Sequence, residues 1–120
     1  MVECKEISFV EIPFKSDTYG VEFQDKGVWY GLYDQDSLVS VANIIKVGRK
    51  YRLKSNFTDP SRRGRGYFTL LLDWLVNELY AGKDLEADCL VSSYRIYEKL
   101  GFTVIQVKNF KKFDIYKVAK

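Results

Sequence analysis

The stretch FTDPSRRGRGYFTLLLDWLVNEL, residues 57–79, decides how this chain folds. It begins as a polar loop with two glycines and three arginines and continues as a segment with apolar residues at positions 68, 71, 72, 75 and 79. That spacing places the apolar residues on one helical face, as in a helix that packs on a sheet. We therefore predict a helix over residues 67–79, ended by Gly82.

Upstream of the loop, the sequence has the patterns of four strands. They are predicted over residues 5–12, 28–33, 38–47 and 51–57, with a loop at 14–27 and short polar turns elsewhere. Pro13 ends the first strand. The fourth strand alternates, so Leu53 and Phe57 are expected on one face of the sheet and Asn56 on the other. The last three of these strands form an antiparallel meander.

Downstream of the helix, three more strands and a second helix are predicted. The strands cover residues 87–91, 102–108 and 113–118, and the helix covers 94–100. Ser92 and Ser93 are predicted to cap this helix. The order of elements is therefore β-β-β-β-α-β-α-β-β. This order predicts a fold of mixed α/β content, and specifically the α+β class.

Composition limits the chemistry that the protein can perform. With 120 residues, 47% hydrophobic and 29% charged, the chain has the material for one domain, residues 1–120. It contains no histidine, which excludes Ser-His-Asp and Cys-His catalysis and the common zinc sites. No metal is expected.

Location is predicted from the same composition. Cys4 and Cys89 are too few for a disulfide framework, and the N-terminal residues lack the apolar core of a signal peptide. No apolar stretch is long enough to span a membrane. A cytoplasmic protein with no membrane partner is expected.

The loop at residues 59–66 has the properties of a phosphate-binding site. The first N–H groups of a helix lack intrahelical partners, and the helix dipole adds positive potential there. Gly64 and Gly66 let the backbone approach an anion, and the three arginines add charge. No Gly-Lys-Ser/Thr follows, which argues against a nucleoside triphosphate site. A solvated loop of a basic protein is the structural alternative.

Two segments resemble the GCN5-related N-acetyltransferase (GNAT) superfamily. FTDPSRRGRGYFTLLLDWL, residues 57–75, resembles its acyl-CoA loop, in which Arg63 and Gly66 match the first two positions of Arg-x-x-Gly-x-Gly/Ala and Phe68 replaces the third. SSYRIYEKLGF, residues 92–102, resembles the Y-E-K-L-G-F end of the family's next helix. The resemblance implies a small, single-domain member with a mixed, mostly antiparallel sheet.

The resemblance also implies an acetyl-CoA site. Backbone amides of residues 63–68 would hold the pyrophosphate, and residues 56–58 would bond to the pantetheine arm in a splay between the fourth and fifth strands. Tyr97 would be catalytic, protonating the departing CoA thiolate; the structural alternative is a packed aromatic. Ser92 or Ser93 would replace the family's asparagine, which falls at Leu90. The implied cofactor-binding set is Asn56, Phe57, Thr58, Arg63, Gly64, Arg65, Gly66, Tyr67, Phe68, Ser92 and Ser93.

The acceptor side of such a site looks reduced. Residues 13–27 number fifteen, whereas two helices average about 11 residues each, so the helical pair that usually follows the family's first strand does not fit. An open acceptor groove or one completed by a partner is therefore expected, in a monomer or a homodimer. Several carboxylates are available as a general base (Asp17, Glu22, Asp34 and Asp36), although an ordered water can serve.

Two functions follow from these observations. The first is an acyl-CoA-dependent N-acyltransferase, most simply one that transfers acetyl from acetyl-CoA to a primary amine, with a macromolecular acceptor favoured by the open groove. The alternative is a nucleic-acid-binding or nucleobase-modifying protein. It relies on the net charge of +3, on the arginines of the loop and on two basic, aromatic stretches at residues 46–54 and 108–112, which would line a basic open groove.

Overall fold

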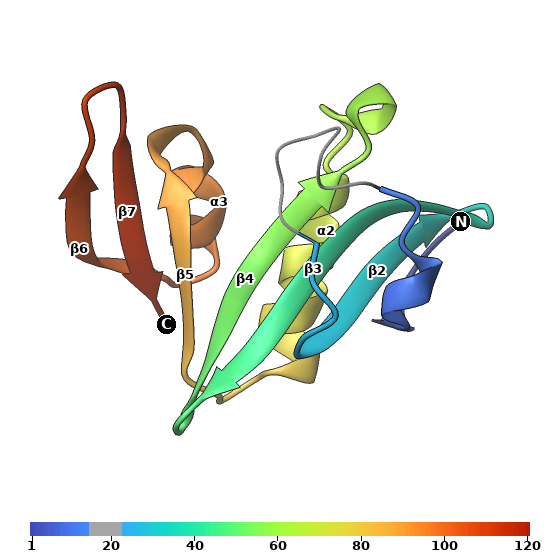
Figure 1. Ribbon diagram of the computed structural model, residues 1–120, viewed down its shortest axis with the longest axis horizontal. Coiled ribbons are helices and arrows are strands. Elements are labelled where there is room, and N and C mark those ends of the chain that lie inside the picture. Colours follow the sequence, from blue (N-terminus) through green and yellow to red (C-terminus); the bar gives the residue numbers. More distant parts are fainter. Residues whose placement is uncertain (15–22) are drawn as a thin grey trace.

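The computed structural model describes residues 1–14 and 23–120, in which seven strands form one sheet in the order β1-β2-β3-β4-β5-β7-β6 (Figure 1). The strands are β1 (Val2–Ile7), β2 (Val28–Asp34), β3 (Ser37–Val47), β4 (Lys50–Thr58), β5 (Leu85–Leu90), β6 (Thr103–Asn109) and β7 (Asp114–Ala119). Neighbouring strands are antiparallel except β4 and β5, which are parallel. The predicted α+β class, the mixed sheet and the order of elements are confirmed.

Two helices cover one face of the sheet, α2 behind β3 and β4, and α3 behind β5 (Figure 1). Helix α2 (Tyr67–Trp74) continues as a π-helical turn, Leu75–Leu79, and α3 spans Val91–Lys99. Residues Leu71, Leu72, Leu75 and Val76 are all at most 2% exposed and form the main core with the sheet. Leu71, Leu72 and Leu75 of the predicted face are therefore buried and Phe68 is partly buried. Leu79 was wrongly placed on this face: it is 46% exposed, and Val76 is buried in the π-helical turn.

A smaller aromatic core lies on the opposite face. It contains Ile7, Trp29, Val41 and Phe57, and Phe9, Phe14 and Phe23 pack around it. The ring of Phe57 lies 4.7 Å from that of Phe14 and 5.5 Å from that of Phe23. This cluster attaches the segments on either side of residues 15–22 to the sheet.

A β-bulge in β4 corrects one prediction. Asn43 pairs with Ser55 and Ile44 pairs with Leu53, so Lys54 is the extra residue. The alternation reverses at the bulge: Leu53 packs in the main core beneath the helices, whereas Phe57 packs in the aromatic core. Placing both residues on one face was therefore wrong. Asn56 instead faces the helices, where it contacts Tyr97.

Two elements differ most in their bounds from the sequence prediction. The first strand ends at Ile7, and Phe9–Glu11 form a 3₁₀ turn that begins after Ser8 and is stabilised by a bond from the Ser8 amide to the Glu11 carboxylate at 2.7 Å. Helix α3 begins at Val91 after Leu90, without a side-chain cap, so Ser92 and Ser93 lie inside its first turn and do not cap it.

The sequence predicted that no pair of helices follows the first strand. Within residues 1–14 and 23–27 the one helical segment is the 3₁₀ turn Phe9–Glu11. Residues 15–22 of the predicted 13–27 segment, with Asp17 and Glu22, lie outside the described residues. No helix in the described part of the chain is long and apolar enough to cross a membrane.

The parallel pair β4 and β5 separates soon after it begins. Three positions are in register, Tyr51 with Leu85, Arg52 with Glu86 and Leu53 with Ala87. Beyond them the strands diverge toward their carboxyl ends (Figure 1). The sheet therefore opens into a splay directly beside the start of α2.

Candidate active site

A cleft of about 920 Å³ occupies the splay between β4 and β5. The predicted site residues that line it are Asn56, Phe57, Thr58, Arg63, Gly64, Gly66, Tyr67, Phe68, Ser93 and Tyr97. Arg65 and Ser92 do not line it. Residues from the loop, from β4 and from α3 thus meet at one place, although they lie far apart in the sequence.

The loop before α2 presents backbone amides to the cleft. The first bond of the helix runs from the Leu70 amide to the Gly66 carbonyl at 3.0 Å, so the amides of Tyr67, Phe68 and Thr69 have no intrahelical acceptor. Gly66 precedes the helix at φ = +80° and provides no side-chain cap. A helix end with free donors beside a cleft suits an anion such as a phosphate.

Both loop glycines have a backbone conformation that other residues rarely adopt. Gly64 has φ = +81° and Gly66 has φ = +80°, and a Cβ on either would meet no atom within 4 Å. The φ angles, and not crowding, therefore require glycine. The open space over them leaves the backbone accessible to a ligand.

Arg63 attaches this loop to the end of β4. Its Nε donates a hydrogen bond to the Thr58 carbonyl at 3.0 Å, and its guanidinium lies 5.2 Å from the centre of the Phe57 ring. Asp59 organises the turn between them, accepting bonds from the Ser61 amide and hydroxyl at 3.0 and 2.9 Å. The arginine is thus held in position at the mouth of the cleft.

Tyr97 is the buried polar group at the inner end of the cleft. It is 1% exposed, and its hydroxyl accepts a hydrogen bond from Asn56 Nδ2 at 3.2 Å. The rings of Phe102 and Phe68 lie 5.3 and 6.3 Å from its own. Burial raises the pKa of Tyr97 well above its ordinary value, with Cys89 adding to the rise and the Asn56 bond opposing it. The phenol is therefore protonated at neutral pH.

Phe68 occupies the place where the family pattern has glycine or alanine. Its ring is partly buried against the main core and stands beside Tyr97, and it lines the cleft. The bulky side chain therefore packs against the core and forms part of the cleft wall.

Sequence reasoning missed the carboxylate that lines the cleft. Asp34 and Asp36 lie at the β2–β3 turn, where the Tyr67 hydroxyl donates to Asp34, and neither lines the cleft. Asp17 and Glu22 lie outside the described residues. Asp88 on β5 does line the cleft. The alternation of apolar and acidic residues along Leu85–Leu90 could have placed Asp88 on the outer face of the sheet, although not beside the cleft.

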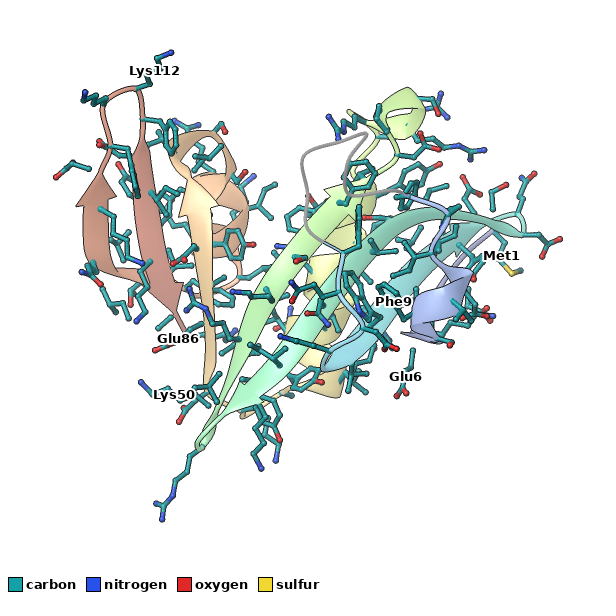
Figure 2. All side chains as sticks on the ribbon, viewed as in Figure 1. Met1, Glu6, Phe9, Lys50, Glu86 and Lys112 are labelled. Atoms are coloured by element: carbon teal, nitrogen blue, oxygen red, sulfur yellow. The ribbon has the colours of Figure 1, made fainter. Side chains whose placement is uncertain are left out.

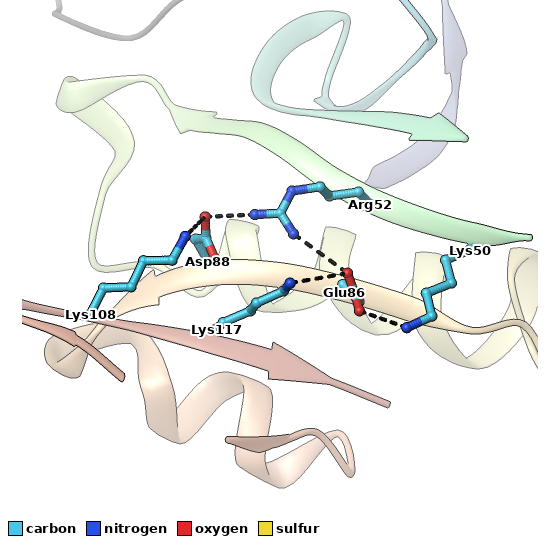
Figure 3. Close-up of polar contacts among 6 residues, drawn as sticks. All are labelled: Lys50, Arg52, Glu86, Asp88, Lys108 and Lys117. Atoms are coloured by element: carbon cyan, nitrogen blue, oxygen red, sulfur yellow. Dashed lines mark hydrogen bonds and ion pairs between the residues drawn. The ribbon is translucent and has the colours of Figure 1, made fainter. Parts of the chain in front are cut away.

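Asp88 belongs to an ionic cluster on the face of the sheet away from the helices (Figure 3). Arg52 donates to Asp88 Oδ2 at 2.6 Å and lies 3.6 Å from Glu86 Oε2. Lys50 lies 3.1 Å from Glu86 Oε1. At longer range, Lys117 lies 3.9 Å from Glu86 and Lys108 lies 4.0 Å from Asp88. The cluster joins β4 to β5 where the splay begins.

This cluster weakens the argument for a nucleic-acid surface. Lys50 and Arg52, from the basic stretch at residues 46–54, are both paired with carboxylates. The second basic stretch lies at the tip of the β6–β7 hairpin, where Lys112 projects from the sheet (Figure 2).

The cysteines are both free, and Cys89 packs in the main core as a small residue while one side of it lines the cleft. Burial raises the pKa of its thiol, which therefore remains protonated near neutral pH. Within residues 1–14 and 23–120, no three side chains of the metal-binding types come together.

A mixed sheet that splays at its parallel pair, with a glycine loop and a helix start beside the splay, is the architecture that the sequence resemblance implied. The sequence matches the acetyltransferase (GNAT) domain family over residues 13–116, and the chain belongs to that family. The resemblance predicted from the loop and the Y-E-K-L-G-F segment is confirmed. No curated protein matches the sequence significantly.

Solved structures share the fold at low sequence identity. IAA acetyltransferase from Bacillus cereus is 19% identical with a TM-score of 0.78, over 99% of this chain and 98% of that one. Ribosomal-protein-S18-alanine N-acetyltransferase from Escherichia coli is 16% identical with a TM-score of 0.77, over 99% and 92%. An aminoglycoside 6'-N-acetyltransferase complexed with coenzyme A is 21% identical with a TM-score of 0.62, over 78% and 71%.

Proposed function

We propose that this protein is an N-acetyltransferase that transfers the acetyl group of acetyl-CoA to a primary amine. One observation carries the proposal: the free amides at the start of α2 and the buried hydroxyl of Tyr97 line the same cleft. The first can hold a phosphate, and the second can supply a proton. Proteins of the family use acyl-CoA. Its pyrophosphate needs an anion site, and its departing thiolate needs a proton.

The chain provides binding groups along the length of the cleft. The amides of residues 63–68 and the side chain of Arg63 would hold the pyrophosphate at the mouth. The edge of β4 at Asn56–Thr58, which turns toward the splay, would bond to the amides of the pantetheine arm as a neighbouring strand would. Bound in this way, the arm would bring the acyl group near Tyr97. The two serines of α3 differ, because only Ser93 lines the cleft.

Tyr97 is proposed as the general acid. The thioester of acetyl-CoA supplies an acyl group activated for transfer. As the amine nitrogen bonds to the acyl carbon, the carbon–sulfur bond breaks, and Tyr97 donates its phenolic proton to the departing sulfur. The surplus amine proton leaves to water, and Tyr97 is reprotonated from solvent. None of these steps needs an imidazole, in keeping with a chain that has no histidine.

The acceptor is proposed to enter from the face opposite the helices. On that face the cleft is bordered by Phe57 and Asp88, whereas α2 and α3 close the other face. An amine carried by a macromolecule could approach this side.

The proposed location is the cytoplasm. Free thiols at Cys4 and Cys89 suit its reducing conditions.

Thermal unfolding with and without ligand tests the proposal. Acetyl-CoA and CoA at 1 mM should raise the Tm by several degrees, because a ligand at about 100 times its Kd adds about 2.7 kcal/mol. Adenosine, which lacks the phosphates, is the control and should produce a much smaller shift. No shift with either CoA species would overturn the proposal. Thiol release from acetyl-CoA against a panel of peptides, polyamines and oligonucleotides would then identify the acceptor.

A further inference from the structure

We infer that Asn56 is a positioning residue of this site: its amide N–H fixes the hydroxyl of Tyr97, and its free amide oxygen accepts a hydrogen bond from an amide N–H of the pantetheine arm. The inference rests on the proposed function, since it assigns a contact to acyl-CoA. It goes beyond that function in assigning the contact to a side chain.

The first observation is the contact between Asn56 and Tyr97, which both line the cleft. Asn56 belongs to β4 and Tyr97 to α3, and Nδ2 of the first lies 3.2 Å from Oη of the second. The tyrosine hydroxyl is the acceptor in this bond. Its own proton is thus left to point elsewhere, and the neighbouring rings of Phe68 and Phe102 offer it no strong acceptor. Because Tyr97 lines the cleft, a group bound there can accept this proton.

The second observation is the other end of the same amide. Among the residues that the structure describes, Asn56 Oδ1 is the one buried side-chain oxygen or nitrogen without a hydrogen-bond partner. Asn56 lines the cleft. A half-turn of the amide would exchange its two ends and leave the nitrogen unpaired instead, so one polar atom lacks a partner in either orientation. Buried polar atoms are nearly always satisfied, and this exception marks a place that a ligand completes.

The chemistry of the ligand matches this unpaired atom. The pantetheine arm carries two amide groups, each with one N–H donor, and it would run along β4 past Asn56. An amide N–H is the donor that a buried carbonyl oxygen accepts in a strand. One contact would therefore satisfy Asn56 and set the depth at which the arm lies.

The bond to Tyr97 has a consequence for proton transfer. Once Tyr97 has given up its proton, a phenolate is left in a buried position where charge is poorly solvated. A donated N–H from Asn56 stabilises that phenolate, and accordingly the bond lowers the pKa of Tyr97 while burial raises it. The bulge at Lys54 makes this possible, because it turns Asn56 toward the helices.

Asn56→Leu is the first test, since leucine has a similar size and no polar atom. The unliganded Tm should stay within about 3 °C of wild type, because the change removes one hydrogen bond and one unsatisfied oxygen together. The Kd for CoA, measured by calorimetry, should rise roughly tenfold because the ligand N–H would lose its acceptor. Asn77→Ala is the matched control: Asn77 bonds to Asp73 on the surface and should bind CoA as wild type does.

Tyrosine NMR gives a second readout that needs no acceptor. With ¹³Cζ-labelled tyrosine, the Tyr97 signal is identified by its absence in Tyr97→Phe. It should move in Asn56→Leu but not in Asn77→Ala. If Asn56→Leu binds CoA as tightly as wild type, or leaves the Tyr97 signal in place, the inference is wrong. If wild type binds no CoA, the proposed function itself fails, so the two failures are distinguishable.

Discussion

Arg52 on β4 donates a hydrogen bond to Asp88 on β5 at 2.6 Å, diagonally across the last point at which the two strands are in register. The same guanidinium lies 3.6 Å from Glu86. Three backbone positions hold this parallel pair together, and the side-chain bonds reinforce it on the face away from the helices (Figure 3). The splay that holds the cleft therefore begins directly beyond this reinforced point.

Arg52→Ala should destabilise the protein by about 1 kcal/mol, the upper range for a partly exposed ionic contact. This corresponds to a fall in Tm of roughly 4 °C, measured by circular dichroism at low salt. In 1 M NaCl the difference from wild type should shrink, because salt screens the pairs. Lys5→Ala is the control, since Lys5 forms its ion pair with an exposed Glu3 in the same strand. Its amino group also lies 4.7 Å from the centre of the Tyr33 ring, and the variant should change the Tm less than Arg52→Ala does. A loss of stability that is independent of salt would indicate that Arg52 acts through packing.

Glu86 should make the protein sensitive to acid. The bond from Lys50, with further help from Lys117 and Arg52, lowers the pKa of Glu86 below its usual range. A carboxyl with a lowered folded-state pKa stabilises the fold above its unfolded pKa of about 4.3 and loses that contribution as the pH falls through the folded value. Urea unfolding from pH 7 to pH 3 should therefore show a steeper decline for wild type than for Glu86→Gln. Parallel curves would contradict this assignment.

Tyr97→Phe should separate chemistry from binding. Loss of a general acid costs about 10²-fold in turnover, whereas the Kd for CoA should change by no more than about twofold, because the phenol is proposed to act on the departing sulfur. Turnover is measured by thiol release and binding by calorimetry. Tyr94→Phe, on the same helix but with its ring against Tyr116, is the control and should retain full turnover. Equal losses of turnover and binding in Tyr97→Phe would assign Tyr97 to packing alone.

Gly66→Ala should weaken CoA binding through the backbone. At φ = +80° an alanine is strained, at a cost of roughly 1–2 kcal/mol, and relief of that strain would turn the loop amides away from the anion. Gly82 provides the matched control, because it has φ = +76° and also has no atom near its absent Cβ, but it does not line the cleft. Both variants should lose similar stability in urea unfolding. Only Gly66→Ala should lose CoA affinity in calorimetry.

Most of the fold was accessible from local pattern. The apolar spacing in α2, the alternation in the strands and the glycine-bearing turns each reflect a periodicity that is written in neighbouring residues. The loop at residues 59–66 and the segment around Tyr97 were recognisable for the same reason, since each is a contiguous motif. Ser92 and Ser93 show the limit of such patterns, because α3 begins one residue before them at Val91.

The relation between the motifs was decided by the tertiary structure. The bulge at Lys54 depends on how β4 pairs with β3, and it reversed the expected faces of Phe57 and Asn56. Asp88 reaches the cleft because β4 and β5 diverge beyond Leu53, which no local pattern encodes. By itself the sequence predicted a helix that starts after a loop of glycines and arginines, and a tyrosine in a family motif. Their convergence with Asn56 on one cleft arose from strand register, a property of residues far apart in the chain.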